Sequence, residues 1–187
     1  IKIINSWANL NSLYKENKEK YELLLWADSK GNAMNTSDPY GSSVSIKERD
    51  YFISIKTGED ISISNALISK SSGEPVIVLA KKVVDDKGKF IGMIGAVLKL
   101  NTFASITNSI RVGETGYAVL VDGTGTAIAH PDPTIMMKLN IVEKIENYPG
   151  LDKIGKNMIQ GKEGIEKYQD IKNKISKRYH NISWLNC

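Results

Sequence analysis

Cysteine, histidine and long hydrophobic runs are scarce in this sequence, and each scarcity excludes a class of protein. The only cysteine is Cys187, the last residue, so no internal disulfide, cysteine-rich zinc site or iron–sulfur cluster is possible. The two histidines, His130 and His180, leave little room for a histidine metal cluster or a histidine-based catalytic triad. No run of about 18 apolar residues occurs, so we expect no membrane-spanning helix within these 187 residues.

The charge is weakly basic and evenly spread. Basic residues number 25 and acidic residues 21, which gives a net charge of +4. The densest basic stretch, residues 172–178, is interrupted by isoleucine and serine and lacks the arginine and aromatic clusters of nucleic-acid-binding proteins. With 41% hydrophobic and 25% charged residues, the composition is that of a folded globular chain with no nucleic-acid partner.

Hydrophobic periodicity predicts a helix and then a hairpin at the start of the chain. One helical face of residues 1–20 carries the apolar residues Ile3, Trp7, Leu10 and Tyr14. This pattern is already running at residue 1, so we expect the helix to begin further upstream in a longer protein. The apolar run 21–27 predicts a buried strand, and a turn at residues 28–31 leads into a returning strand over 32–36.

Further strands and helices are predicted along the rest of the chain, which makes the fold class α+β. Residues 76–84 and 90–100 are typical of two strands, and Gly88 supplies a positive φ in the turn between them. Asn101 is expected to cap the helix that follows. The later elements are strands over 116–121, 126–129, 165–171 and 175–184, a helix that begins at Asp132 and Pro133 and includes Ile135, Met136 and Leu139, and a helix that includes Leu151, Ile154 and Met158.

An internal repeat indicates that one supersecondary unit occurs twice. Five residues recur at a single offset of 94: Asp28, Gly31, Ala33, Asp38 and Pro39 return as Asp122, Gly125, Ala127, Asp132 and Pro133. A period of this length is too long for a solenoid and fits a whole α+β module. The alternative is two unrelated hairpins, because Asp and Gly are common in turns.

The order of the motifs resembles that of double-Cache sensor domains, whose modules are PAS-like. Residues 45–52 (SIKERDYF) resemble the family's RDYF segment, and residues 113–117 (GETGY) with 128–131 (IAHP) resemble the opening of its second module. The other matching segments are residues 57–58, 63–65, 72–78 and 92–95. The resemblance implies an N-terminal long helix over 1–20, a membrane-distal ligand-binding module over 21–100, and a connecting helix with a membrane-proximal module over 101–187.

The resemblance also implies a ligand site in the distal module. It places Arg49, Tyr51 and Phe52 in the site, where a guanidinium fork suits a carboxylate and two aromatic rings exclude water. From the residues alone, Arg49 could instead pair with Glu48, Asp50 or another surface acid while the rings fill the core. The remaining candidate site residues are Trp26, Asn65, Leu67, Ser69 and Val97.

The candidate site departs from the pattern of amino-acid receptors in this family. Those receptors have acids that receive the ligand ammonium, whereas Leu67, Ser69 and Val97 stand at the matching motif positions. A buried charge without its partner costs about 2–5 kcal/mol. We therefore expect a carboxylate, an uncharged metabolite or a more apolar ligand rather than an α-amino acid held in the family's usual way.

The leading hypothesis is the extracytoplasmic ligand-sensing domain of a bacterial membrane receptor, most simply a chemotaxis receptor, that is not an enzyme. It needs no cofactor and no metal, meets the membrane only through transmembrane helices outside this chain, and forms a homodimer through the N-terminal helix. Three alternatives stay open: the sensor of a histidine kinase or diguanylate cyclase, a structural dimerisation domain with a vestigial pocket, and a cytoplasmic PAS-type sensor carrying haem or flavin. His130, beside Pro131, is expected to fix a turn.

Overall fold

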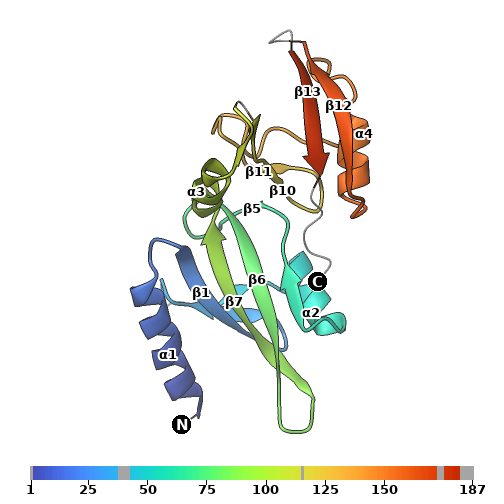
Figure 1. Cartoon of the computed structure of the whole chain (residues 1–187). Helices are drawn as coiled ribbons and strands as arrows, with labels where there is room; N and C mark the ends of the chain where they lie inside the picture. The colour runs from blue at the N-terminus through green and yellow to red at the C-terminus, as the bar shows by residue number, and fades with distance from the viewer. Residues whose placement is uncertain (1, 38–42, 115, 172–174, 182–187) are drawn as a thin grey trace. The chain divides into compact units, whose positions relative to one another are not determined.

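The computed structural model describes residues 2–37, 43–114, 116–171 and 175–181. The chain divides into two compact units, Ile1–Thr102 and Phe103–Cys187. The candidate residues from Trp26 to Val97 all belong to the first unit. The helix α1 (Lys2–Glu16) opens it and lies beside the strand β1 (Tyr21–Asp28) (Figure 1).

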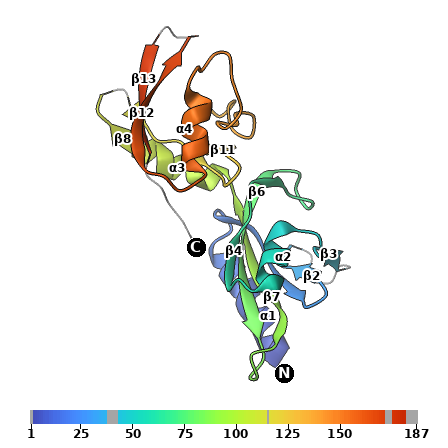
Figure 2. The same ribbon diagram turned by 90° about the vertical axis from the view of Figure 1, so that its right-hand side faces the viewer.

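The first unit is built on one antiparallel sheet of seven strands. Its order is β3-β2-β1-β7-β6-β4, with β5 also paired to β6. The strands after β1 are β2 (Asn32–Asn35), β3 (Val44–Ser45), β4 (Ile61–Ile63), β5 (Leu67–Ile68), β6 (Pro75–Val84) and β7 (Phe90–Lys99). The helix α2 (Asp50–Thr57) packs on β4, β6 and β7 (Figure 2). The predicted strands of this region and the turn at Gly88 (φ 78°) are confirmed.

One face of this sheet and α2 enclose the main hydrophobic cluster. Strand residues alternate between the two faces of a sheet, so alternate residues in the central parts of β1, β6 and β7 point into the cluster. Its members are Leu23, Leu25, Ala27, Ala33, Ile46, Tyr51, Phe52, Ile55, Val76, Val78, Ala80, Met93 and Val97, with Leu67 and Phe90 packed against them. The cluster therefore joins the start of α2 to the centre of the sheet.

The second unit contains shorter elements. The helix α3 (Asn101–Ser109) precedes three two-stranded sheets. They pair β8 (Arg111–Val112) with β9 (Gly116–Tyr117), β10 (Leu120–Val121) with β11 (Ala127–Ala129), and β12 (Gly164–Asp170) with β13 (Ile175–Asn181). The helix α4 (Leu151–Met158) stands before β12, as predicted from Leu151, Ile154 and Met158.

The repeat predicted from the sequence is confirmed at its two turns. In each turn the Asp Oδ1 accepts backbone N–H bonds from the residues two and four positions later, at 2.9 Å and 2.9 Å for Asp28 and at 2.9 Å and 3.0 Å for Asp122. Gly31 (φ 85°) and Gly125 (φ 84°) hold the same left-handed conformation. Of the remaining pairs, Ala33 and Ala127 are both buried, whereas Asp38 and Pro39 lie outside the described residues.

Two predicted helices differ in the structure. The helix expected over residues 1–20 ends at Glu16, because the Asn17 side chain donates to the Leu13 carbonyl at 3.0 Å and the backbone then turns. The helix expected from Asp132 is wrong, since residues 131–138 form turns. There Met137 has a φ of 62° and its N–H donates to the Ala127 oxygen at 2.9 Å, so a bond to a strand replaces the bond a helix would need.

Two predicted strands differ in extent. The strand expected over residues 116–121 is split into β9 and β10, with residues 118 and 119 in neither. The strand expected over 175–184 is β13, which ends at Asn181, and residues 182–184 lie outside the described residues.

Candidate ligand-binding site

The start of α2 brings three of the candidate residues together. Arg49 is the N-cap of the helix, with an extended backbone (φ −76°, ψ 136°), and its side chain makes no capping hydrogen bond. Helical geometry then turns Tyr51, Phe52 and Ile55 onto the buried face, where they are 4%, 1% and 0% exposed. Arg49 is half-buried and directly precedes this apolar face of the helix.

The acids beside Arg49 have other partners. The Asp50 carboxylate accepts the backbone N–H of Tyr51 at 2.7 Å, and Glu48 lies 4.0 Å from the ammonium of Lys47. Within the described part of the chain, no ion pair or side-chain hydrogen bond involves the Arg49 guanidinium. Among the described residues Arg49 therefore pairs with neither Glu48 nor Asp50, whereas Tyr51 and Phe52 are core residues, as that alternative expected.

Tyr51 is buried, and the pKa of its hydroxyl is shifted from the usual value. Burial raises the pKa of the Tyr51 hydroxyl to about 12, while the positive charge of Arg49 lowers it and the negative charge of Asp50 raises it further. The guanidinium is therefore close enough for its charge to act on the phenol. At neutral pH the site therefore offers a cation and a neutral hydroxyl, both of which can bind a carboxylate.

Apolar side chains surround this polar pair. The Phe52 ring lies 6.3 Å from the ring of Phe90 at an interplanar angle of 59°, and the Lys56 ammonium lies 5.9 Å from the Phe52 ring centre. Val97 belongs to the same cluster as Tyr51 and Phe52, and Leu67 packs against it. The structure thus brings Tyr51, Phe52, Leu67 and Val97 to one side of the sheet.

Two other candidates do not share this arrangement. Trp26 lies between Leu25 and Ala27, which both point into the cluster, so its half-buried side chain is on the opposite face of the sheet. There it is paired with Met34 and Ile94. Asn65 is half-buried in the connection between β4 and β5. The position of Trp26 between two apolar residues of a predicted strand already indicated, from the sequence, that its side chain lies on the face opposite theirs.

Ser69 is buried, and it contacts a residue that the sequence analysis did not select. Its hydroxyl donates a short hydrogen bond to the Glu22 carboxylate Oε1 and accepts the backbone N–H groups of Ser71 (3.1 Å) and Ser72 (3.3 Å). Glu22 is the only charged residue among the six that begin β1, YELLLW, and this isolated acid in an apolar run was the available signal. The candidate residue Ser69 therefore has the Glu22 carboxylate as its neighbour.

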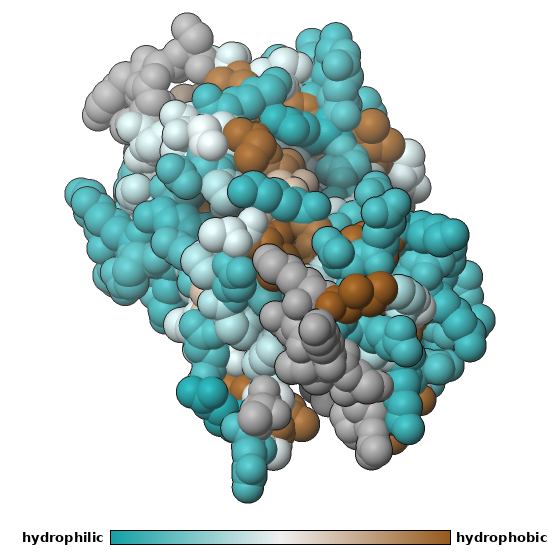
Figure 3. Space-filling view, turned by 90° about the horizontal axis from the view of Figure 1, so that it is seen from above, coloured by the Kyte–Doolittle hydropathy of each residue, from teal (hydrophilic) through white to brown (hydrophobic). Residues whose placement is uncertain are grey.

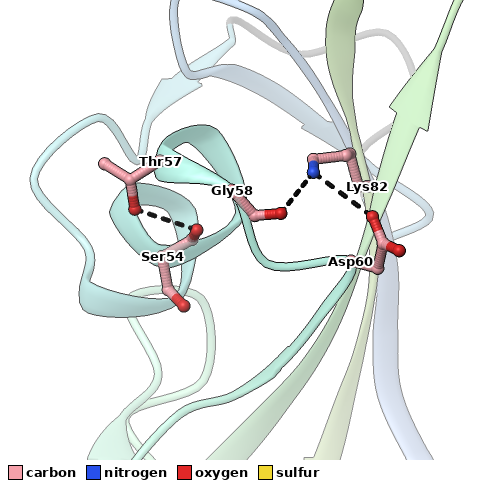
Figure 4. Close-up of polar contacts among 5 residues, drawn as sticks. All are labelled: Ser54, Thr57, Gly58, Asp60 and Lys82. Atoms are coloured by element: carbon pink, nitrogen blue, oxygen red, sulfur yellow. Dashed lines mark hydrogen bonds and ion pairs between the residues drawn. The ribbon is translucent and has the colours of Figure 1, made fainter. Parts of the chain in front are cut away.

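The far end of α2 is fixed by Lys82 of β6. Its ammonium donates to the Gly58 carbonyl at 2.5 Å and to the Asp60 carboxylate at 3.2 Å (Figure 4). The Thr57 hydroxyl caps the last turn through the carbonyls of Ser54 (3.1 Å) and Ile53 (2.9 Å). These bonds hold the helix on the sheet, whereas the Arg49 side chain at the other end makes no hydrogen bond or ion pair to any residue that the structure describes.

Neither the face drawn in Figure 3 nor the possible metal ligands among the described residues give a second candidate site. In the face drawn in Figure 3, hydrophobic residues form small groups among hydrophilic ones. Among the described residues, no group of three or more His, Cys, Asp and Glu side chains could hold a metal ion. The His130 Nδ1 accepts the Asp132 N–H at 2.9 Å and the ring meets Tyr117 edge-on at 5.2 Å, which agrees with its predicted role in a turn.

No helix in the described part of the chain is both long enough and apolar enough to cross a bilayer. The curated relatives are named methyl-accepting chemotaxis proteins. The chain is 27% identical over 92 residues to the methyl-accepting chemotaxis protein PscA of Pseudomonas syringae, covering 49% of this chain and 14% of that protein. It is 43% identical over 51 residues to the methyl-accepting chemotaxis protein PctB of Pseudomonas aeruginosa, covering 27% and 8%. The chain thus spans less than a sixth of the length of these relatives.

Solved sensor domains share the fold. The extracellular domain of a protein described as a histidine kinase, mmHK1S-Z2, matches with a TM-score of 0.72 at 14% identity over 93% of this chain and 74% of that one. The ligand-binding domain of the Pseudomonas fluorescens chemoreceptor CtaA, solved with L-serine, matches with a TM-score of 0.52 at 25% identity over 63% and 51%. A family model described as the Cache domain matches residues 4–185. Because that match extends over nearly the whole sequence, the chain belongs to the Cache-domain family.

Proposed function

We propose that the first unit of this chain is the ligand-binding part of an extracytoplasmic sensor, and that Arg49 and Tyr51 hold the carboxylate of a small solute. The observation that carries the proposal is the half-buried residue Arg49, whose guanidinium has no ion pair among the described residues and which directly precedes the helix that supplies Tyr51 and Phe52 to the apolar cluster. A charge in such a place is suited to an anionic ligand, because a charge-assisted hydrogen bond contributes about 1.5–3 kcal/mol.

The ligand environment supports recognition rather than catalysis. Tyr51 keeps its proton at neutral pH, so it can donate to the same carboxylate that Arg49 binds. Phe52, Leu67 and Val97 supply apolar contact area on the same side of the sheet. We therefore infer a binding module whose ligand leaves unchanged, which mass spectrometry of recovered ligand would check.

Calorimetric titration of this domain tests the carboxylate. The probes are small carboxylic acids, including L-amino acids, each measured beside its uncharged amide. We expect the acid to bind and the Arg49→Gln variant to lose about 10-fold or more in affinity, as expected for one lost charge-assisted hydrogen bond. Arg111→Gln, an exposed arginine of the second unit, is the matched control and keeps the affinity. Equal affinity in wild type and Arg49→Gln contradicts the proposal.

We propose the cellular role from the family to which the chain belongs. Relatives named as methyl-accepting chemotaxis proteins and a neighbour described as a histidine-kinase extracellular domain support a place outside the cytoplasm, in a receptor that signals across the membrane. We propose that the first unit is the membrane-distal module and the second unit the membrane-proximal one. Accessibility of cysteines introduced into each unit of the full-length receptor, labelled from outside intact cells, checks this topology.

We also propose that two copies associate through α1. Leu13 of this helix is 45% exposed, which leaves an apolar side chain for a partner helix. Light scattering of the domain with and without residues 1–16 measures the effect. A monomer in both cases over the micromolar range contradicts association through α1.

A further inference from the structure

The sheet of the first unit ends at β4, whose only strand partner among the described residues is β6. In an antiparallel pair, residues that turn both backbone groups towards the partner strand alternate with residues that turn them away. The Asp60 carbonyl oxygen and the Ser64 nitrogen are each bonded to the β6 backbone at 2.9 Å, so these two residues turn inward. Ile61 and Ile63 therefore present their N–H and C=O groups at the outer edge of the sheet.

The side chains of β4 extend an apolar band on one face of the sheet. Leu79, the partner of Ile63, precedes the cluster residue Ala80 in β6, so Leu79 and Ile63 point away from the cluster. Ile61, Ile63 and Leu79 are each 41% exposed, and Ile94 of the neighbouring β7 is 37% exposed. Exposed apolar side chains thus meet outward backbone groups, and β4 has neither the proline nor the charged residue that usually protects an edge strand.

The sequence of β4, Ile-Ser-Ile, reads the same in both directions. When two such edges pair antiparallel around Ser62, Ile61 of each copy stands opposite Ile63 of the other, and the outward groups of these residues exchange backbone hydrogen bonds. The acids Glu59 and Asp60 of the two copies then lie at opposite ends of the pair. A parallel pairing in register would set these like charges side by side, which is unfavourable. The edge is therefore complementary to a second copy of itself in the antiparallel direction.

We propose that β4 is the edge at which a second copy of this chain pairs antiparallel with the first, joining the two sheets into one. The inference does not depend on the ligand site. It also differs from association through α1, since α1 lies beside β1, and β7 and β6 separate β1 from β4 in the sheet. A contact of three residues per copy is smaller than a stable interface requires, so we expect a weak dimer with a dissociation constant of about 0.1 mM.

Disulfide trapping tests the predicted register. All variants carry Cys187→Ser, so that the introduced cysteine is the only one. The two Ser62 residues face each other without sharing backbone bonds, which sets their Cα atoms about 4.5 Å apart, within the reach of a disulfide. Ser62→Cys is therefore expected to give a cross-linked dimer under mild oxidation. Glu59→Cys is the matched control, because the two Glu59 positions of the antiparallel pair lie about 20 Å apart.

Analytical ultracentrifugation from about 10 µM to 1 mM measures the dimer without a cross-link. Ile63→Pro removes an outward N–H and leaves the bonds to β6 in place, so it should raise the dissociation constant at least about 10-fold while the chain stays folded. Ile61→Lys adds a charge to the edge and should act in the same direction. Ile91→Lys, at a residue of β7 with a similar exposure of 44%, is the control and keeps the wild-type constant. Circular dichroism of each variant checks the fold.

The outcomes separate a β4 dimer from other assemblies. Equal cross-linking of Ser62→Cys and Glu59→Cys, or a dimer that Ile63→Pro and Ile61→Lys both leave unchanged, overturns the inference. A dimer that disappears only when residues 1–16 are removed assigns association to α1 and overturns it as well. A wild-type chain that stays monomeric to about 1 mM also overturns it, including when its β4 edge binds an unrelated extended peptide.

Discussion

The backbone oxygen of Gly31 accepts a hydrogen bond from the backbone nitrogen of Ile46 at 2.8 Å, and Gly125 is joined to Ile141 in the same way at 2.9 Å. Both isoleucines are buried, at 6% and 2% exposure. In both units an Asp-x-x-Gly turn is therefore tied to a segment that lies about 15 residues further along the chain. The shared bond extends the repeat beyond the residues that revealed it in the sequence.

Gly31 is predicted to be more sensitive to substitution than a glycine with the same backbone but open surroundings. A Cβ at Gly31 would lie 2.8 Å from the Lys47 Cα, whereas at Gly88 (φ 78°) nothing lies within 4 Å. Gly88→Ala should lower the free energy of unfolding by about 1–2 kcal/mol, because alanine disfavours the left-handed conformation. Gly31→Ala should cost a further 1–3 kcal/mol or so for the steric overlap. Urea denaturation compares them, and equal losses would show that the Lys47 backbone yields freely.

Asp28 is predicted to make stability depend on acid pH. Burial raises its pKa, but the side-chain bond from Asn32 and the backbone bonds from Asn32, Lys30 and Gly31 outweigh burial, and the net pKa lies below 3.8. The folded state thus favours the carboxylate, so the stabilisation is complete above pH 3.8 and is lost as the pH falls through the folded pKa. Asp28→Asn should flatten the stability curve below about pH 4. Parallel curves for variant and wild type would contradict this.

The strands and turns of the first unit could be predicted because each depends on residues that are neighbours in the sequence. Leu23–Ala27 and Val76–Ala80 are apolar runs of strand length, and Gly88 needs only its own turn. The helix expected at Asp132 failed because Met137 bonds to Ala127 of β11, a tertiary contact that no window around Met137 contains. Glu22 was missed for the same reason, since its meaning depends on Ser69, which is 47 residues away.

Lys82 is predicted to stabilise the packing of the C-terminal end of α2 on the sheet. Its side chain is 20% exposed and its ammonium bonds the Gly58 carbonyl and the Asp60 carboxylate. Lys82→Met leaves the carbonyl without this donor and should lower the free energy of unfolding by about 1–2 kcal/mol. Asp60→Ala should cost less than about 1 kcal/mol, because that carboxylate is 85% exposed. Lys81→Met, at the exposed neighbour, serves as the control in chemical denaturation, and a loss as large as that of Lys82→Met would refute the specific role.

Tyr51 is predicted to make stability fall at alkaline pH. Burial raises its pKa to about 12, above the usual value of 10.0, so the folded state holds the phenol proton more tightly than the unfolded state does. The resulting stabilisation is complete below pH 10 and is lost as the pH rises from 10 through 12. Tyr51→Phe has no proton to lose, so the gap in unfolding free energy between wild type and variant should narrow over that interval. Thermal unfolding followed by circular dichroism between pH 8 and 11.5 measures the gap. The seven other tyrosines titrate in both proteins and cancel in the comparison, so a gap that stays constant would mean that Tyr51 ionises as readily in the folded chain as in the unfolded one.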